Sequence, residues 1–280
     1  MAVNTTTGAP VLTPAQVAEL VIRPTLEQSL AGNPAIATTV RIESHELRIP
    51  VLTNDTGAVW VNEGQEISTN DVVLDEELVT PSKLARVVPI TRELANDSSP
   101  AATQIVGDSI ARSLAKGIDQ ALFATVASPA PAGLSTLSGI GSIPAGTAWT
   151  SFDWAADALS AAETAGAQLT SWVTSPAVAL ALSKLRKATG SNEALLGADP
   201  TQPTRRIIAG LPLFISPDIE ANTILGIPAA HVYTVVREDA EVVSDSSVFF
   251  TSDRVAIKGT VRVGFGFTHP AAVQKITVTA

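Results

Sequence analysis

The sequence predicts an α+β protein built from two structural regions, and three stretches lead to that prediction. A long amphipathic helix begins near residue 100, strands and helices alternate in the middle of the chain, and the final third is nearly all strand. The chain has 280 residues and 45% hydrophobic content, enough to bury one large core or two modest ones. A globular fold is therefore expected rather than disorder.

The first fifty residues are expected to hold a loose arm, a helix and two strands. A cap signal at Thr13 and a stop signal at Gly32 bound the predicted amphipathic helix, with Pro24 as a kink or break. From 36 to 52, apolar and polar residues alternate as they do in strands, with a turn near Ser44.

The stretch from 60 to 94 reads as a long hairpin with β-branched residues on both arms and a polar tip near 68 to 71. Residues 49 to 82 hold seven acids and no Lys or Arg, a net charge of −7. If the hairpin turns at that tip, Glu63 falls close to Glu76, and opposed like charges destabilise a strand pair. Cations and apolar surface must then come from elsewhere, which indicates that the hairpin packs on another subunit.

The candidate inter-subunit contacts are therefore the tryptophan and acids of this hairpin, together with arginines that lie outside its acidic segment. The arginines of a neighbouring copy would supply the cations that the segment lacks. The hypothesis names Trp60, Glu63, Glu66, Asp71, Asp75, Glu76, Glu77, Arg86, Arg92, Arg112, Arg205 and Arg206.

A long helix follows the hairpin. Apolar residues recur every four positions from Val106 to Leu122, and a start signal precedes Pro100, which predicts a helix of about 35 Å. Residues 127 to 150 are rich in Ser, Pro, Gly and Ala and read as a connector at a domain boundary.

Beyond the connector, a helix, a buried strand and a second helix with Ser175 as its cap indicate an α/β layer. A Gly-x-Pro sequence then bends an apolar strand. The last third is predicted as strands that break at Asp239, at 244 to 247 and at Gly264.

The sequence holds no residue pattern typical of catalysis, cofactor binding or metal binding. There is no Cys, and His45, His231 and His269 are far apart in the chain, so neither a thiolate site nor a histidine metal site is expected. Neither a G-x-S-x-G serine motif nor a complete dinucleotide fingerprint is present. The acids near residue 75 lack the Asp-x-Asp-x-Asp-Gly loop of a calcium site, which favours a charged face.

Charge and hydropathy exclude two further classes. The net charge is −9 without a basic stripe, so sequence-specific binding of DNA or RNA is not expected. The first residues lack a signal peptide, and no run approaches the roughly 20 apolar residues of a membrane span. The chain is expected to be made in the cytoplasm and to stay soluble.

Four stretches, in one order along nearly the whole chain, resemble the major capsid proteins of tailed bacteriophages, whose fold is named for phage Hong Kong ninety-seven. WVNEGQEIS followed by TPSKLARVVPITREL resembles the family's extended loop and its return into the peripheral domain. DSIARSLAKGIDQALF, which contains Asp119, resembles the long spine helix. RRIIAGLPLFISPDI resembles the Gly-x-Pro strand of the axial domain, and FTSDRVAIKGTVRVGFGFTHPAAV resembles the closing strands.

The resemblance implies a structural protein, not an enzyme, that forms hexamers and pentamers of an icosahedral shell around double-stranded DNA. The implied partners are copies of the chain, with a separate scaffolding protein, a portal and a decoration protein as further candidates. The implied location is the virion, after synthesis in the cytoplasm of a host bacterium. Its regions would be an N-terminal arm and helix (1–35), peripheral-domain strands (36–56), the extended loop hairpin (57–82), the peripheral domain with spine helix and connector (83–150), the axial domain (151–235) and closing strands that return to the peripheral domain (236–280).

The sequence departs from some family members in two ways. The resemblance starts within the first few dozen residues, so a long N-terminal scaffolding region is not expected. Residues 1 to 82 contain no lysine, so an isopeptide bond from the extended loop to an asparagine of a neighbour has no nucleophile.

Three alternatives remain open at this point. An encapsulin-type nanocompartment shell shares the fold, and the long acidic loop and N-terminal arm favour the phage capsid over it. A phage tail tube subunit fits poorly with the long helix and the α/β layer. A soluble two-domain hydrolase is the most remote.

Overall fold

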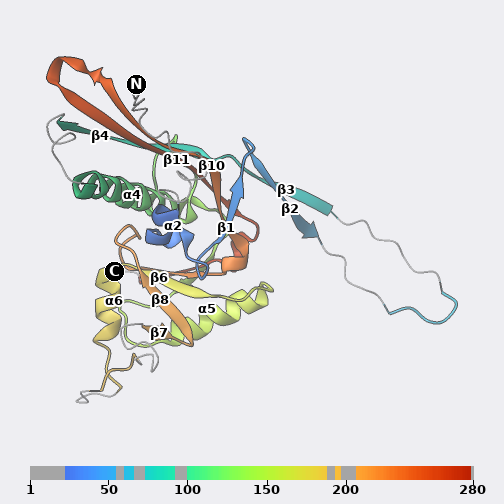
Figure 1. The fold of residues 1–280 in the computed structure, drawn as a ribbon. Helices are drawn as coiled ribbons and strands as arrows, with labels where there is room; N and C mark the ends of the chain where they lie inside the picture. The colour runs from blue at the N-terminus through green and yellow to red at the C-terminus, as the bar shows by residue number, and fades with distance from the viewer. Residues whose placement is uncertain are drawn as a thin grey trace.

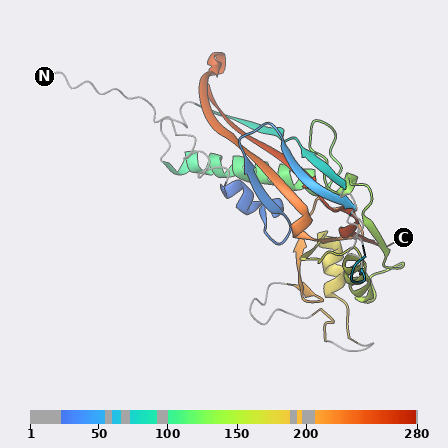
Figure 2. The same cartoon turned by 90° about the vertical axis from the view of Figure 1, so that its right-hand side faces the viewer.

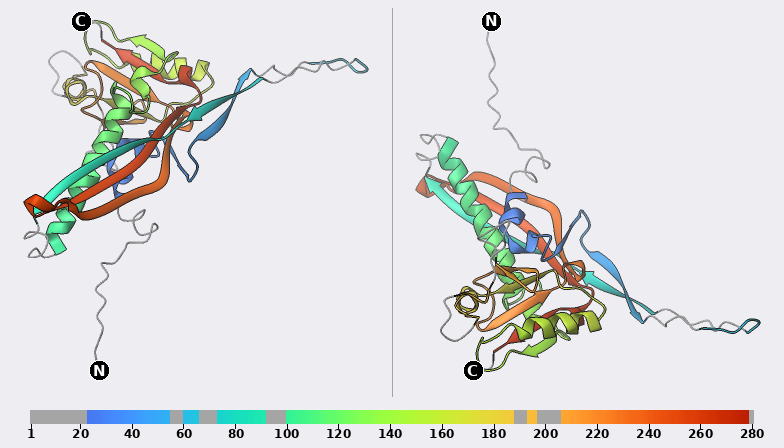
Figure 3. Two further views of the ribbon diagram at one scale, coloured as in Figure 1. Left: turned by 90° about the horizontal axis from the view of Figure 1, so that it is seen from above. Right: turned by 90° about the horizontal axis from the view of Figure 1, so that it is seen from below.

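The structure is a computed structural model that describes residues 23–54, 60–65, 73–91, 100–187, 193–196 and 206–278. A four-stranded sheet with the longest helix forms an upper body, and a six-stranded sheet with two shorter helices forms a lower body (Figure 1). A two-stranded ladder projects from the upper body to one side (Figures 1 and 3).

The upper sheet has the strand order β1-β10-β11-β4, in which β1 runs parallel to β10 and the other pairs are antiparallel. Helix α4 lies along one face of this sheet, and α2 with the short turn η2 packs against α4 (Figures 1 and 2). The bounds are α2 Arg23–Gln28, η2 Leu30–Gly32, β1 Thr38–Ile42, β4 Ser82–Thr91, α4 Pro100–Phe123, β10 Val232–Phe249, η5 Phe250–Ser252 and β11 Arg254–Phe267.

Helix α4 confirms the predicted long helix. It has 24 residues, which is about 36 Å at 1.5 Å per residue. Because every fourth residue falls on one side of a helix, the apolar stripe faces the sheet. On β11, a Cβ at Gly259 would lie 2.5 Å from the Ile110 side chain, so the absence of a side chain there allows the close approach. The buried residues of the stripe are Ile110, Leu114, Ile118 and Leu122.

The lower sheet has the strand order β5-β12-β9-β6-β8-β7. Its central strand β6 is completely buried, and Trp172 on that strand packs edge to face with Trp154 of α5, with ring centroids 5.4 Å apart. The bounds are η3 Leu134–Thr136, β5 Gly141–Pro144, α5 Asp153–Thr164, β6 Ser171–Thr174, α6 Pro176–Ser183, β7 Ile207–Ile208, β8 Leu211–Ile215, β9 Thr223–Ile227, η4 Ala229–His231, η6 Pro270–Ala272 and β12 Gln274–Thr277.

The α/β layer predicted beyond the connector is confirmed. Helix α6 begins at Pro176, and the Ser175 hydroxyl accepts a hydrogen bond from the Val178 amide at 3.5 Å. The prediction that 127 to 150 is only a connector is wrong, because β5 lies within it and pairs in parallel with β12. A four-residue strand is too short to show periodicity, and its partner lies more than a hundred residues later.

The final strands run further than predicted. Strand β10 continues through Asp239 and through 244 to 247, because two irregularities in its pairing with β11 absorb these positions. Strand β11 passes through Gly264, where a Cβ would lie 2.8 Å from Val79. The predicted breaks are therefore wrong, and this glycine permits close packing rather than ending a strand.

Two smaller expectations can be compared with the structure. The predicted end of the first helical region at Gly32 is confirmed by η2, whereas the start at Thr13 lies outside the described residues. The bend near the Gly-x-Pro sequence is a hairpin turn between β7 and β8, in which Ala209 and Gly210 have φ of 50° and 82°.

Candidate assembly surface

The projecting ladder is formed by β2 (Leu47–Asn54) and β3 (Val73–Val79), which pair antiparallel and join no other sheet. Residues 60–65 lie beyond its outer end, far from both bodies (Figures 1 and 3). They form a turn in which the Gln65 amide donates to the Asn62 carbonyl at 3.1 Å and Gly64 has φ of 84°. We call the ladder and this turn the arm, which is a different segment from the N-terminal arm expected within residues 1–35.

The strand pairing within the arm corrects the predicted hairpin. Strand β3 pairs with β2, which precedes the loop, and Glu76 lies opposite Pro50 rather than Glu63. The Glu76 carboxylate lies 3.3 Å from the guanidinium of Arg48, so the expected clash of two acids is replaced by an exposed ion pair. The predicted tip at 68–71 lies outside the described residues.

The arm exposes large apolar side chains while its base is fixed. Trp60 is 101% exposed, Leu74 69% and Leu78 53%. At the base, Val79 and Pro81 are buried, and Val79 packs against the glycines near the end of β11. Large exposed apolar side chains on a projection whose base is held in place are typical of a surface that meets a partner.

The arm is also strongly acidic. Asp75 and Glu76 are exposed and Glu77 is half-buried, each on β3. Within the ladder, Arg48 is the one basic residue by sequence, and it contacts Glu46 at 3.0 Å as well as Glu76. These contacts, first with Glu46, raise the pKa of the Arg48 guanidinium.

The three predicted arginines that the structure describes lie on the two bodies and not on the arm. Arg86 of β4 donates to the Ser109 carbonyl of α4 at 3.1 Å, and Arg112 is exposed on the same helix. Arg206 is half-buried beside β7 in the lower body. Four residues of the hypothesis, Glu66, Asp71, Arg92 and Arg205, lie outside the described residues.

A polar contact that the sequence reading missed fastens the first described segment to α4. The Asp119 carboxylate accepts hydrogen bonds from the Ser29 hydroxyl at 2.6 Å and from the Ala31 amide at 3.1 Å. The Ala31 carbonyl in turn accepts from the Thr234 hydroxyl at 2.8 Å. Burial raises the pKa of Asp119, against the lowering effect of these donors. In the sequence, the one sign of this contact is the position of Asp119, an acidic residue that directly follows Ile118 of the apolar stripe.

Two of the three histidines meet where the chain passes between the bodies. The rings of His231, before β10, and His269, after β11, pack edge to face with centroids 5.4 Å apart. Nδ1 of His231 lies 3.2 Å from the Thr268 hydroxyl, and Nε2 of His269 lies 2.8 Å from the Ala165 carbonyl. Burial, and then the charge of its neighbour, lower the pKa of His231.

No group of three or more His, Cys, Asp or Glu suited to a metal ion occurs among the residues that the structure describes. No described helix is long and apolar enough to span a membrane.

The fold is similar to that of solved structures from phages and from a GTA particle. The structure is similar to the capsid of the empty GTA particle, with TM-score 0.73, 21% identity and coverage of 100% of this chain and 95% of that chain. It is also similar to structures from Microbacterium phage Oxtober96 (TM-score 0.71, 19% identity, 89% and 90% covered) and Mycobacterium phage Adephagia (TM-score 0.69, 16% identity, 91% and 89% covered).

Residues 11–278 match the phage capsid family, and the chain belongs to it. A curated relative, the capsid polyprotein of Pseudomonas phage PAJU2, is 30% identical over 184 residues, which is 60% of this chain and 26% of that protein. The chain thus spans about a quarter of the length of that relative. The predicted α+β capsid fold and the resemblance to the phage capsid family are confirmed.

Proposed function

We propose that this chain is the major capsid protein of a tailed phage, a subunit without enzymatic activity that assembles into hexamers and pentamers of an icosahedral shell around double-stranded DNA. The observation that carries the proposal is the arm, which holds exposed Trp60, Leu74 and Leu78 and most of the segment with charge −7 outside both cores. Large apolar side chains exposed outside both cores are typical of a surface that a partner covers. Family membership makes another copy of the chain the natural partner.

The acids of the arm are proposed to face cations of a neighbouring subunit. A close pair of opposite charges gains about 4 kcal/mol at an intermediate dielectric. Solvent and salt reduce the net contribution of one exposed pair to about 1 kcal/mol or less. The contribution of Glu63, Asp75, Glu76 and Glu77 is therefore expected to be collective, together with that of Glu66 and Asp71. Arg86, Arg92, Arg112, Arg205 and Arg206 are the candidate cations on the neighbour.

The upper body is assigned as the peripheral domain and the lower body as the axial domain. The packaged DNA is held without sequence-specific binding, since a chain of net charge −9 grips phosphates weakly. A separate scaffolding protein, a portal and a decoration protein are further candidate partners for this role. The protein would reside in the virion.

Reversing the arm's charge tests the proposal. Changing Asp75, Glu76 and Glu77 together to Lys is expected to leave the subunit folded, because these side chains lie outside both cores. Assembly should weaken, since lysines would repel the neighbour's arginines. Circular dichroism measures the fold, and the yield of sedimented particles measures assembly.

A matched control changes three acids on α5, Asp153, Asp157 and Glu163, to Lys, since all three are exposed and the change in net charge is the same. The control should assemble better than the arm variant. Equal yields would mean that the arm's acids face solvent or DNA. Loss of the folded spectrum in the arm variant alone would mean that the ladder stabilises its own subunit.

A further inference from the structure

We infer that Trp60 of one copy inserts into an apolar cavity of a neighbouring copy, between the second half of α4, strand β4 and residues 126–131. This inference rests on the proposed shell assembly and deepens it by naming the two surfaces that meet. It assigns to the cavity a specific occupant, an aromatic side chain carried on an acidic loop.

Trp60 differs from the other tryptophans of the chain. Trp149, Trp154 and Trp172 pack edge to face in the lower body, with neighbouring centroids 5.9 and 5.4 Å apart. Trp60 is 101% exposed at the end of the arm, next to the partly exposed Val61. Aromatic side chains that are buried on association dominate many interfaces, because they cover a large apolar area at low conformational cost.

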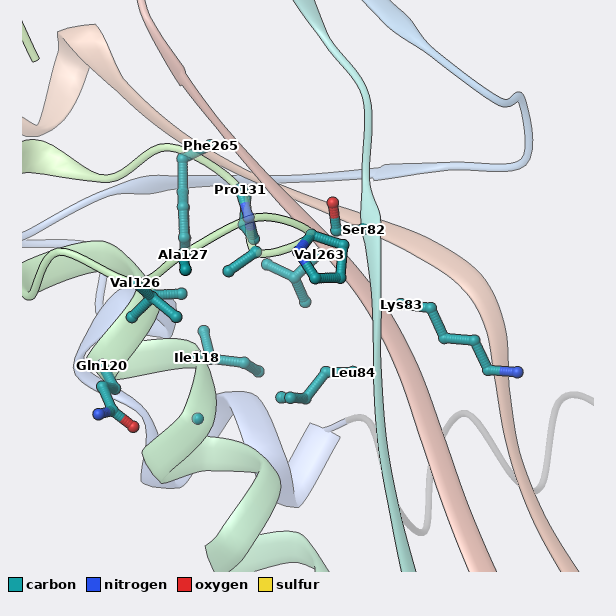
Figure 4. A pocket seen from close by; sticks show the side chains of 14 residues that line it. Ser82, Lys83, Leu84, Ile118, Gln120, Val126, Ala127, Pro131, Val263 and Phe265 are labelled. Carbon is teal, nitrogen blue, oxygen red and sulfur yellow. The ribbon is translucent and has the colours of Figure 1, made fainter. Parts of the chain in front are cut away.

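The cavity has the size and chemistry to receive such a side chain. Its volume is about 280 Å³, far above the roughly 15 Å³ that a cavity needs to hold one water. Leu84 and Ile118 form its inner wall, and Val126, Pro131 and Phe265 close it from the other side (Figure 4). Val126 is 38% exposed, so an apolar side chain already lies at the opening.

The arm directs Trp60 away from the cavity of its own chain. The ladder ends at Val79, and the cavity begins three residues later at Ser82. The seven residues of β3 at about 3.3 Å each extend roughly 23 Å outward before the loop begins. A second copy placed beside the first can present its cavity to the arm, and repetition of that contact around a ring is a heterologous interface that closes.

Charge also favours this partner. Trp60 lies three positions from Glu63, within the segment of charge −7. At the cavity, Lys83 lies on the outer side of β4 (Figure 4). Lys83 is paired in register with Arg262 of β11, which is paired with Arg237 of β10, so three cations cross the sheet in one row. The row lies on the face of the sheet turned away from the cavity, so an acidic loop that crosses the edge strand β4 to place Trp60 in the cavity passes Lys83, a charge of opposite sign.

Cysteine trapping tests the contact in assembled particles, and the natural chain has no cysteine to confuse the result. The double variant Val61→Cys with Val126→Cys keeps Trp60 and places thiols on both sides of the contact. After mild oxidation, a ladder of multiples of the 28.9 kDa chain should appear on a non-reducing gel and collapse with reductant. Disulfides need Cβ atoms about 3.5–4.5 Å apart, so random encounters contribute little.

The control pair is Val61→Cys with Leu180→Cys, because Leu180 is 54% exposed on α6, outside the cavity. It should give no ladder. Particles of the first pair that give no ladder, or equal ladders from both pairs, would overturn the inference. Wild-type chains that form no particles at all would instead overturn the proposed function.

A further variant tests the inference if the double cysteine variants fail to assemble. Ala127→Trp, at an exposed lining position, fills the cavity while leaving Trp60 in place. Its particle yield should fall at least tenfold with an unchanged circular dichroism spectrum. Wild-type yield from this variant would overturn the inference.

Discussion

Replacing Asp119 with Ala is expected to lower the free energy of unfolding by about 2 kcal/mol. The change leaves the Ser29 hydroxyl and the Ala31 amide without the carboxylate that accepts from them at 2.6 and 3.1 Å. A buried donor left without an acceptor costs about 1–3 kcal/mol. The Ala31 amide keeps the Ser29 oxygen at 3.1 Å, so the lower end of that range applies to it. The better helix propensity of Ala returns roughly 0.5 kcal/mol.

Urea unfolding of free subunits at pH 7 measures this loss. The control is Asp108→Ala, because Asp108 is exposed on the same helix and its replacement should change stability by no more than about 0.5 kcal/mol. Equal unfolding midpoints for the two variants would refute the role given to Asp119.

The raised pKa of Asp119 provides a second test. A carboxyl whose folded pKa lies above its usual 3.8 binds its proton more tightly in the native state, so the stability linked to that proton is present at low pH and is lost as pH rises through the folded pKa. Asp119→Asn should remove this pH dependence while keeping one acceptor oxygen. An unchanged pH dependence in that variant would contradict the assignment.

Two further predictions concern the histidine pair and the extended loop. Acidification from pH 7 to 5 should destabilise the wild type more than the His231→Gln variant. In the folded state, burial and then the charge of His269 lower the pKa of His231, whereas in the unfolded chain this residue takes up a proton near pH 6.5. Protonation therefore favours the unfolded wild-type chain. Melting temperatures across that range measure the effect, with His45→Gln at an exposed position as the control; identical pH profiles for the two variants would contradict it. Particles boiled in SDS should run as one band near 28.9 kDa, since residues 1 to 82 contain no lysine for an isopeptide bond, and a ladder that survives boiling would show the opposite.

Local signals in the sequence were enough to predict elements whose cause is local. The four-residue stripe of α4 and the Ser175 cap of α6 are examples, because each depends on residues within one or two turns of helix. Glycines were harder to interpret. Gly264 was predicted to break a strand, but the reason for a glycine there is the approach of Val79 from a distant part of the chain.

Pairing between distant segments was not predictable in the same way. An acidic strand can pair with the segment before the loop or with the loop itself, and only the structure shows that Glu76 faces Pro50. The same limit applies to the candidate surface. The row formed by Lys83, Arg262 and Arg237 comes from three separate strands, so its members look like scattered charges in the sequence.

The strand order of the two sheets has a consequence for synthesis in the cell. Strands β10 and β11 occupy the middle of the upper sheet, and β12 lies between β5 and β9 in the lower one. Because chains emerge from the ribosome N-terminus first, the upper sheet lacks a strand until Phe267 has been made and the lower sheet until Thr277 has been made. The arm, by contrast, is complete by residue 79. A nascent chain therefore carries the sequence of its arm long before it has the last strands of either body, and the glycines of β11 that hold Val79 at the base of the arm are among the residues still to be made.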